Sequence, residues 1–216
     1  CNNSSTQVCI EIAKAAQEIS VDGLMISIPP YNKPTQEGIY QHFKAIHDAT
    51  NLPIMLYSVP SRTGVDFTLE TIIRLCKLEK VAAFKDAGGN AMRALMLNAE
   101  LKNKIIILSG DDEAALAFNA NGAKGVVSVM SNLLPEKVMQ MQDLWFANNA
   151  FKALELQLEL LPLYKSIFVE TNPIGIKYAM SLLGLCKEGV RLPLCATSEN
   201  NKILVKKSLQ EQKILA

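Results

Sequence analysis

The sequence predicts an α/β fold in which parallel strands alternate with helices, followed by a helical C-terminal segment. Short apolar runs alternate with amphipathic stretches, and we predict buried strands at residues 23–28, 54–59, 81–86, 105–110 and 125–129. Near-continuous apolar strands separated by helices are typical of a parallel sheet that is covered on both faces. The repeat therefore predicts either a doubly wound sheet or a (β/α)8 barrel.

Helices between the strands are predicted from apolar residues that recur at helical spacing. They cover residues 36–48, 68–77, 90–100 and 112–120, with Thr68 as the N-cap of the second. A further helix at 5–19 precedes the first strand and would be the crossover from an earlier strand. Because a barrel needs eight strands, we expect about three strands to be absent on the N-terminal side.

The pattern changes after residue 129, where the remaining apolar stretches have helical spacing. Helices are predicted at residues 134–145, 151–161, 172–183 and 198–209. We therefore expect a partial (β/α)8 barrel over residues 1–132, followed by the last barrel helix and a C-terminal helical segment over residues 133–216.

Composition favours small-molecule chemistry over nucleic-acid or membrane binding. The 216 residues carry a net charge of +1 with acids and bases mixed, so no basic stripe marks a nucleic-acid face. No apolar run approaches the roughly 20 residues that span a bilayer, and no signal peptide is visible. The five cysteines are scattered, which indicates free thiols in a reducing cytoplasm. His42 and His47 lack a third ligand, so no metal site is expected.

Lys85 is the strongest candidate for a chemical role. It lies at the C-terminal end of the strand predicted at 81–86, and active sites of barrels are found at that end. An amine flanked by apolar residues can have its pKa lowered by desolvation, which leaves a neutral nucleophile that attacks a ketone to form an imine. From position alone, a strand-end lysine that extends its amine to solvent is an equally good interpretation.

Three more side chains lie near strand ends, and each also has a purely structural interpretation. Tyr57, one strand before Lys85, could shuttle protons at the amine or be a core tyrosine. Arg62, in the loop after that strand, suits carboxylate capture or is a surface arginine. Tyr31 lies in a proline-bounded loop and is either functional or a packed aromatic.

The segment Ser109-Gly110-Asp111-Asp112 ends the strand predicted at 105–110. Gly110 permits a tight turn or the close approach of a ligand. The paired acids lack a third metal ligand, so we expect Asp111 or Asp112 to cap the following helix instead.

Together these segments resemble a known family. The order and spacing are those of bacterial dihydrodipicolinate synthases, which are pyruvate-dependent aldolases, in residues 30–38 (PYNKPTQEG), 57–64 (YSVPSRTG), 84–86 (FKD), 109–112 (SGDD) and 125–129 (GVVSV). The resemblance covers essentially the whole chain. It implies a (β/α)8 barrel and a Schiff-base-forming lyase. It also implies that no cofactor is needed, because the covalent imine of Lys85 with pyruvate serves instead.

The resemblance also implies roles for the candidate residues. Lys85 would form the imine with pyruvate, and Tyr57 would donate and accept the proton there. Tyr31 would belong to the proton relay and reach into the active site of a neighbouring subunit. Arg62 would bind the carboxylate of the second substrate, aspartate semialdehyde.

Gly110 and the backbone carbonyl of Val127 would line the pyruvate pocket of such an enzyme. The product would be 4-hydroxy-tetrahydrodipicolinate, in the cytoplasmic biosynthesis of lysine and diaminopimelate. The family resemblance further implies a homo-oligomer, usually a tetramer.

Two alternatives to this activity stay open. Sialic-acid lyases have similar tyrosine and lysine strands, although they do not usually carry the Ser-Arg-Thr-Gly segment that contains Arg62. A chain that lacks its first strands could also be an inactive, truncated remnant. Regulation is a separate expectation: the positions that bind feedback lysine in many family members align with Ser4, Val8 and Pro30. Because valine cannot accept hydrogen bonds from an amine, inhibition by lysine should be weak or absent.

Overall fold

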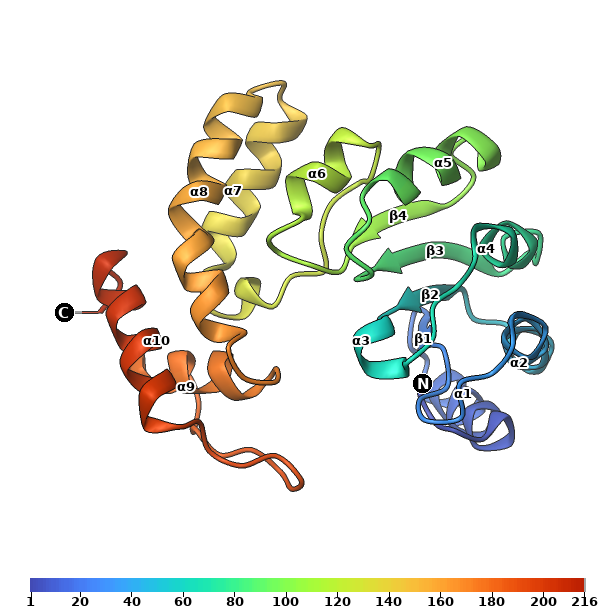
Figure 1. Cartoon of the computed structure of the whole chain (residues 1–216). Helices are drawn as coiled ribbons and strands as arrows, with labels where there is room; N and C mark the ends of the chain where they lie inside the picture. The colour runs from blue at the N-terminus through green and yellow to red at the C-terminus, as the bar shows by residue number, and fades with distance from the viewer. Residues whose placement is uncertain (216) are drawn as a thin grey trace. The chain divides into compact units, whose positions relative to one another are not determined.

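The computed structural model describes residues 1–215. They fall into two compact units, divided between Val127 and Ser128. The first unit contains strands and helices, and the described part of the second contains helices (Figure 1). The expected domain division after residue 132 stays a prediction, because compactness alone does not define a domain.

The first unit is built on a parallel sheet. Its described residues contribute four strands in the order β1-β2-β3-β4 (Figure 1). These strands are β1 (Leu24–Ser27), β2 (Ile54–Ser58), β3 (Val81–Asp86) and β4 (Ile106–Ser109). Each neighbouring pair is parallel. The strands predicted at 23–28, 54–59, 81–86 and 105–110 are thus confirmed.

The strand predicted at residues 125–129 is wrong, because its pairing stops after one bridge. Ser109 and Val126 form an isolated parallel bridge. The chain then turns, and the Ser128 hydroxyl oxygen accepts a hydrogen bond from the Ser131 amide (2.8 Å). An apolar run indicates burial, but it does not show where such a turn ends the pairing.

The helices of the first unit distinguish the two predicted folds. They are α1 (Thr6–Glu18), α2 (Gln36–Ala49), α3 (Pro60–Thr63), α4 (Leu69–Leu75), α5 (Met92–Leu101) and α6 (Ala115–Ala120). Helices α1, α2, α4 and α5 contact one another in sequence. With the strands also in sequential order, this arrangement places the crossovers on one face of the sheet, as in a (β/α) barrel and unlike a doubly wound sheet.

Threonine caps fix the starts of two of these helices. The Thr35 hydroxyl accepts a hydrogen bond from the Gly38 amide (3.2 Å) at the start of α2. The Thr68 hydroxyl accepts one from the Thr71 amide (3.2 Å) at the start of α4, which confirms the predicted N-cap. The one-turn helix α3 was not predicted, because it is too short to show a periodic pattern.

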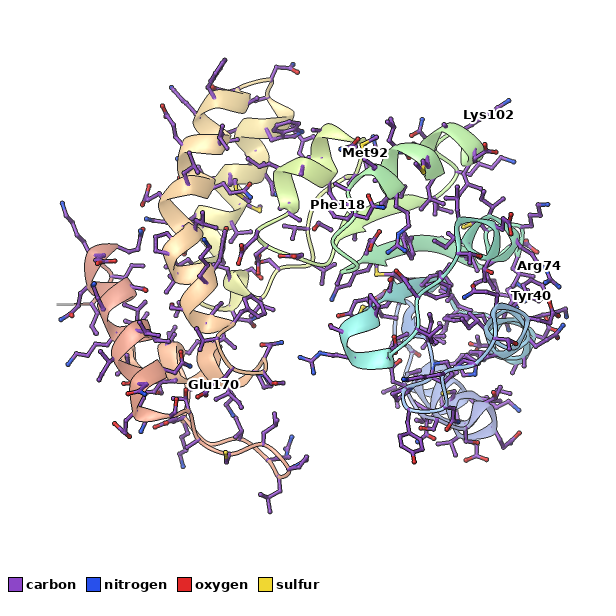
Figure 2. The ribbon with its side chains drawn as sticks, viewed as in Figure 1. Tyr40, Arg74, Met92, Lys102, Phe118 and Glu170 are labelled. Carbon is purple, nitrogen blue, oxygen red and sulfur yellow. The ribbon has the colours of Figure 1, made fainter. Side chains whose placement is uncertain are left out.

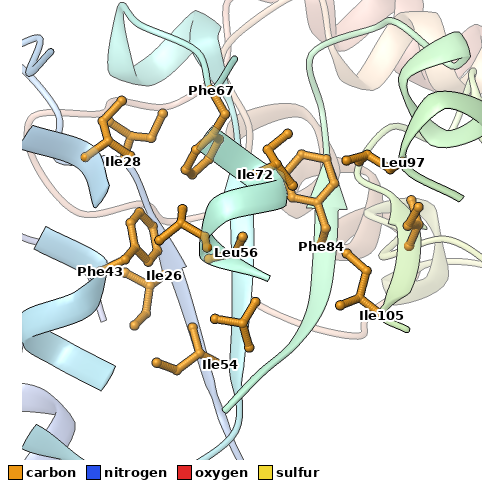
Figure 3. Close-up of a cluster of buried hydrophobic side chains, with 14 of the residues drawn as sticks. Ile26, Ile28, Phe43, Ile54, Leu56, Phe67, Ile72, Phe84, Leu97 and Ile105 are labelled. Atoms are coloured by element: carbon orange, nitrogen blue, oxygen red, sulfur yellow. The ribbon is translucent and has the colours of Figure 1, made fainter. Parts of the chain in front are cut away.

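The core of the first unit lies between the sheet and these helices (Figure 3). Phe84 of β3 and Phe43 of α2 are fully buried. The Phe67 ring lies between them, with its centroid 5.6 Å from that of Phe43 and 6.1 Å from that of Phe84. Because successive side chains of a strand point to opposite faces, Lys85 faces away from this core.

The second unit begins with η1 (Met130–Asn132), and the predicted helices follow as α7 (Pro135–Phe146), α8 (Ala150–Ile167), α9 (Ile174–Leu182) and α10 (Glu199–Glu211). Helices α7 and α8 lie side by side, and α10 packs against α8 and α9 (Figure 1). Tyr164, Leu160 and Leu209 are fully buried among them. Over residues 1–215, no helix has the length and apolar character needed to cross a membrane.

Glu170 fastens the start of α10 within this second unit (Figure 2). Its carboxylate accepts hydrogen bonds from the Ser198 amide (3.1 Å), the Ser198 hydroxyl (2.5 Å) and the Thr197 hydroxyl (2.6 Å). These bonds, chiefly the one from the Ser198 hydroxyl, hold the pKa of Glu170 below its usual value. Ser198 is the N-cap of α10, so the carboxylate holds the cap in place.

Candidate active site

Tyr57 and Lys85 lie side by side at the C-terminal ends of β2 and β3. They are partners in the parallel register, so both side chains leave the sheet on the same face. The Lys85 Nζ atom lies 4.1 Å from the centroid of the Tyr57 ring. Lys85 is only 8% exposed, which does not fit a lysine that extends its amine into solvent. The structure therefore brings this predicted pair together.

The surroundings of Lys85 favour the neutral amine. Burial lowers the pKa of Lys85 below that of a free lysine, and the negative charge of Asp112 partly opposes this shift. Asp112 is itself buried, in the segment between β4 and α6. A lowered pKa raises the fraction of neutral amine at neutral pH, and only the neutral amine attacks a carbonyl carbon.

The positive charge of Arg62 acts on the phenol of Tyr57. Burial raises the pKa of the half-buried Tyr57 phenol, and the positive charge of Arg62 works against that rise. The phenol therefore stays protonated at neutral pH and can donate a proton. Arg62 lies in α3, immediately after β2, and this short helix ends at Gly64, whose φ of 72° is left-handed. The turn thus leaves Arg62 exposed at the edge of the site.

Gly110 lies against Lys85, as expected for a residue that lines a pocket around the amine. A Cβ atom at this position would lie 2.9 Å from the Ala87 Cβ and 3.0 Å from the Lys85 Cε. The Gly110 amide also donates a hydrogen bond to the Asp86 carbonyl (2.7 Å). Only glycine fits this approach without displacing its neighbours.

The other two predicted site residues, Val127 and Tyr31, lie in different surroundings from each other. The Val127 amide donates to the Ser109 carbonyl (2.8 Å), which holds Val127 at the C-terminal end of β4. Tyr31 is 90% exposed, with a left-handed φ of 73°. Among the described residues, no hydrogen bond or ring contact joins Tyr31 to Lys85. Its loop therefore presents the ring to solvent and not to the site of its own chain.

The expectation that Asp111 or Asp112 caps α6 is wrong. The N-cap is Ala114, and it makes no side-chain hydrogen bond to the helix. The Asp111 carboxylate instead accepts a hydrogen bond from the Glu113 amide (2.9 Å) and closes a turn before the helix. Spacing alone does not distinguish a turn of this kind from a cap, since both use an aspartate just before a helix.

The sequence did not reveal a cluster of charged side chains around Arg93, on the helix-covered face of the sheet. Arg93 of α5 donates hydrogen bonds to Asp86, Asp66 and Ser58. One signal for this group was present: Asp86 follows Lys85 in the strand, so its carboxylate must point into the helix-covered face, where a buried acid needs a cation. Nothing in the sequence indicated which cation that would be.

No group of three or more potential ligands gathers for a metal ion among residues 1–215. His42 is buried between α1 and α2, and its Nδ1 lies 2.9 Å from the Thr6 hydroxyl. His47 lies beside Asp48, with 2.9 Å between its Nδ1 and the carboxylate. The two histidines thus take part in separate local contacts.

The parallel sheet has its helices on one face, and a buried lysine lies at the C-terminal end of one of its strands. Both features are typical of the (β/α)-barrel enzymes that form a Schiff base. The chain belongs to the dihydrodipicolinate synthetase family, whose family model matches residues 2–212.

Relatives and solved structures agree with this membership. The chain is 51% identical over 202 residues to a 4-hydroxy-tetrahydrodipicolinate synthase from Rickettsia bellii (strain OSU 85-389), covering 94% of this chain and 69% of that protein. It is 40% identical to the solved 4-hydroxy-tetrahydrodipicolinate synthase from Methylacidiphilum fumariolicum SolV, with a TM-score of 0.95 over 98% of this chain and 71% of the other. A chloride-inhibited dihydrodipicolinate synthase from Acinetobacter baumannii, solved with pyruvate, is 37% identical, with a TM-score of 0.95 over 99% of this chain and 74% of the other. The similarity to these solved structures shows that the chain has the α/β fold of a TIM barrel.

Proposed function

We propose that this protein is a lyase that condenses pyruvate with aspartate semialdehyde to give 4-hydroxy-tetrahydrodipicolinate. Membership of the family and the relatives' shared name support the reaction. One observation supports the place of the chemistry: Lys85 carries a buried amine of lowered pKa at the C-terminal end of β3, against the ring of Tyr57.

In this proposal, Lys85 is the nucleophile. Its neutral Nζ attacks the keto carbon of pyruvate, and loss of water from the carbinolamine gives the imine. The protonated imine draws electrons from the methyl carbon, which loses a proton to give an enamine. The enamine carbon attacks the aldehyde of the second substrate. Attack of that substrate's own amine on the imine carbon then closes the ring and releases Lys85.

Tyr57 is the proposed proton donor and acceptor at the carbinolamine. Its phenol stays protonated at neutral pH, because burial raises its pKa. A tyrosine hydroxyl at the site can give a proton to the departing water and take one back later. Gly110 leaves room for the substrate next to Lys85, and the carbonyl of Val127 is proposed to line the same pocket.

Arg62 is the proposed carboxylate binder for aspartate semialdehyde, because a guanidinium matches a carboxylate with two parallel hydrogen bonds. Tyr31 is proposed to complete the proton relay in a neighbouring subunit of a homo-oligomer. Its 90% exposure in a single chain supports such a role. The proposed setting is the cytoplasm, where the five free thiols would stay reduced.

A substrate comparison tests this proposal. We expect product from pyruvate and aspartate semialdehyde and no cleavage of a sialic acid. We also expect Arg62→Met to raise the KM for aspartate semialdehyde by about tenfold or more, with little change in the KM for pyruvate. The exposed Arg191→Met, in the second unit, is the matched control. Cleavage of sialic acid without synthase activity would contradict the proposal, and so would the absence of any activity in a folded sample.

A further inference from the structure

A nearly buried guanidinium joins the ends of β2 and β3 on the face of the sheet opposite the amine of Lys85. Arg93, in the first turn of α5, donates from Nε to Asp86 Oδ2 (2.7 Å) and from Nη2 to Asp86 Oδ1. It also donates from Nη1 to Asp66 Oδ2 (2.8 Å) and from Nη2 to Ser58 Oγ (3.1 Å). The Arg93 side chain is 11% exposed. One side chain therefore holds three separate segments of the chain.

The acceptors are themselves held in place. The Ser58 hydroxyl donates to Asp66 Oδ1 (2.6 Å), and the Gly88 amide donates to Asp86 Oδ1 (2.8 Å). Asp86 is fully buried, and a buried carboxylate is costly unless it is paired and hydrogen-bonded. The planar fork of arginine satisfies both oxygens of Asp86 at once, which the ammonium of lysine cannot do.

This network is fixed to the backbone around the reactive amine. Asp86 directly follows Lys85, and its carbonyl accepts the hydrogen bond from the Gly110 amide (2.7 Å). The Ser58 carbonyl, directly after Tyr57, accepts a hydrogen bond from the Ala87 amide (2.9 Å). Movement of Asp86 or Ser58 would therefore also move the amine, the phenol or the pocket glycine.

Asp66 lies in the segment that follows the helix of Arg62, and a second side chain, that of Gln36, also binds this segment. The side-chain amide of Gln36 donates from Nε2 to the Asp66 carbonyl (2.8 Å), and its Oε1 accepts from the Thr68 backbone amide (3.0 Å). Asp66 is thus held by Arg93 through its side chain and by Gln36 through its backbone. The Arg93 network extends in this way from the strand end that carries Lys85 to the segment that follows α3, the helix of Arg62.

We propose that Arg93 is a positioning residue for the reaction at Lys85, and that it acts through Asp86, Ser58 and Asp66. The inference rests on the proposed imine chemistry, and it adds a residue that touches neither substrate nor amine. Arg93 has two effects. Its fork sets the spacing of the strand ends, and its charge balances the carboxylate of Asp86, the residue that follows Lys85.

The charge effect gives a readout that a purely structural role would not move. Tyr57 from β2 lies against the Lys85 amine, and the charge of Asp112, from the segment before α6, acts on its pKa. The carboxylate of Asp86, the next residue of the strand, lies on the opposite face of the sheet, where Arg93 binds it. Arg93 balances Asp86. Without that positive charge, Asp86 would add to the effect of Asp112 and favour the protonated amine, so that the pKa of Lys85 would rise.

The test follows the pH dependence of imine formation in the complete chain, by borohydride trapping of pyruvate. We expect Arg93→Met to move the midpoint upward by about one pH unit. Adding Asp86→Asn to that variant should move it back, because both charges are then removed. Arg93→Lys keeps the charge but loses the fork. It should leave the midpoint unchanged and lower kcat about tenfold, with little change in the KM for pyruvate.

Arg74→Met is the control for the loss of an arginine ion pair away from the site, since Arg74 of α4 pairs with Glu37 of α2 and lies over Tyr40 (Figure 2). It should change neither the midpoint nor kcat. Circular dichroism establishes that each variant is folded. If Arg93→Met does not fold, the kcat of Arg93→Lys alone tests the positioning role of Arg93.

This inference alone would be overturned if the wild-type protein gives the pyruvyl adduct and neither arginine variant has the expected effect. In that case the pH midpoint of trapping is unchanged in Arg93→Met, and kcat is unchanged in Arg93→Lys. The absence of any wild-type adduct would overturn the proposed function, and this inference with it.

Discussion

At the scale of single residues, the site depends on how closely Gly110 approaches Lys85. A Cβ at this position would lie 3.0 Å from the Lys85 Cε, so Gly110→Ala must displace the lysine or Ala87. We expect kcat/KM for pyruvate to fall by up to about a hundredfold, because a small misplacement of a reacting group is costly. Steady-state kinetics measure this. Gly189→Ala, which meets no atom within 4 Å, should behave as wild type. Wild-type kinetics in Gly110→Ala would contradict the site.

His42 gives the first unit a pH-dependent stability. Burial lowers the pKa of His42 to about 4, from 6.5 for a free histidine. Between these values the unfolded chain binds a proton that the folded chain does not. The contribution is therefore complete above about pH 6.5 and is lost as the pH falls toward 4, by about 3 kcal/mol at most.

Urea unfolding at about pH 7.5 and about pH 5 measures this loss for His42, since the histidine of the unfolded chain gains its proton between these values while the folded one stays neutral. His42→Gln keeps a polar partner for Thr6 but cannot titrate, so its free energy of unfolding should change less between the two pH values. An equal change in both proteins would show that other groups cause the loss.

The sequence allowed Lys85 and Tyr57 to be paired, because strand alternation and the C-terminal strand end both apply to them. It did not allow Arg93 to be found. Its partners lie 7 residues away at Asp86 and 27 residues away at Asp66, and only the packing of α5 on the sheet brings them together. A helical arginine is usually exposed, so position alone gave no reason to expect it buried.

At the scale of elements, the N-cap of α4 gives a direct test of the predicted helix start. The Thr68 hydroxyl accepts from the Thr71 amide, so Thr68→Ala leaves that donor without a cap. We expect the free energy of unfolding to fall by about 1 kcal/mol, while Thr68→Ser, which keeps the hydroxyl, should stay close to wild type. Urea denaturation measures both variants. Equal losses in both would point to the lost methyl contact instead of the cap.

Elements with a strong period could be predicted, and those ended by local turns could not. The apolar strands β1 to β4 and the longer helices of both units appear where the pattern placed them. The run at residues 125–129 is apolar, yet it pairs only through Val126, because the turn at Ser128 ends the ladder. Helix α3 was missed since one turn gives no period.

At the scale of the whole molecule, regulation is the clearest open prediction. Two of the three positions expected to align with lysine-binding residues of the family are in contact, because the Ser4 hydroxyl donates to the Pro30 carbonyl (3.2 Å). The third position is Val8, whose side chain cannot accept a hydrogen bond from an ammonium group. Added lysine should therefore leave the rate of product formation unchanged. Half-inhibition by lysine below millimolar concentration would contradict this.

The central claim is that the amine of Lys85 forms an imine with pyruvate. Borohydride reduction in the presence of pyruvate, followed by peptide mass spectrometry, tests it most directly. We predict a reduced pyruvyl adduct on the peptide that contains Lys85 and none in Lys85→Arg, whose guanidinium stays charged. A folded protein that gives no adduct, or an adduct on another lysine, would contradict the claim.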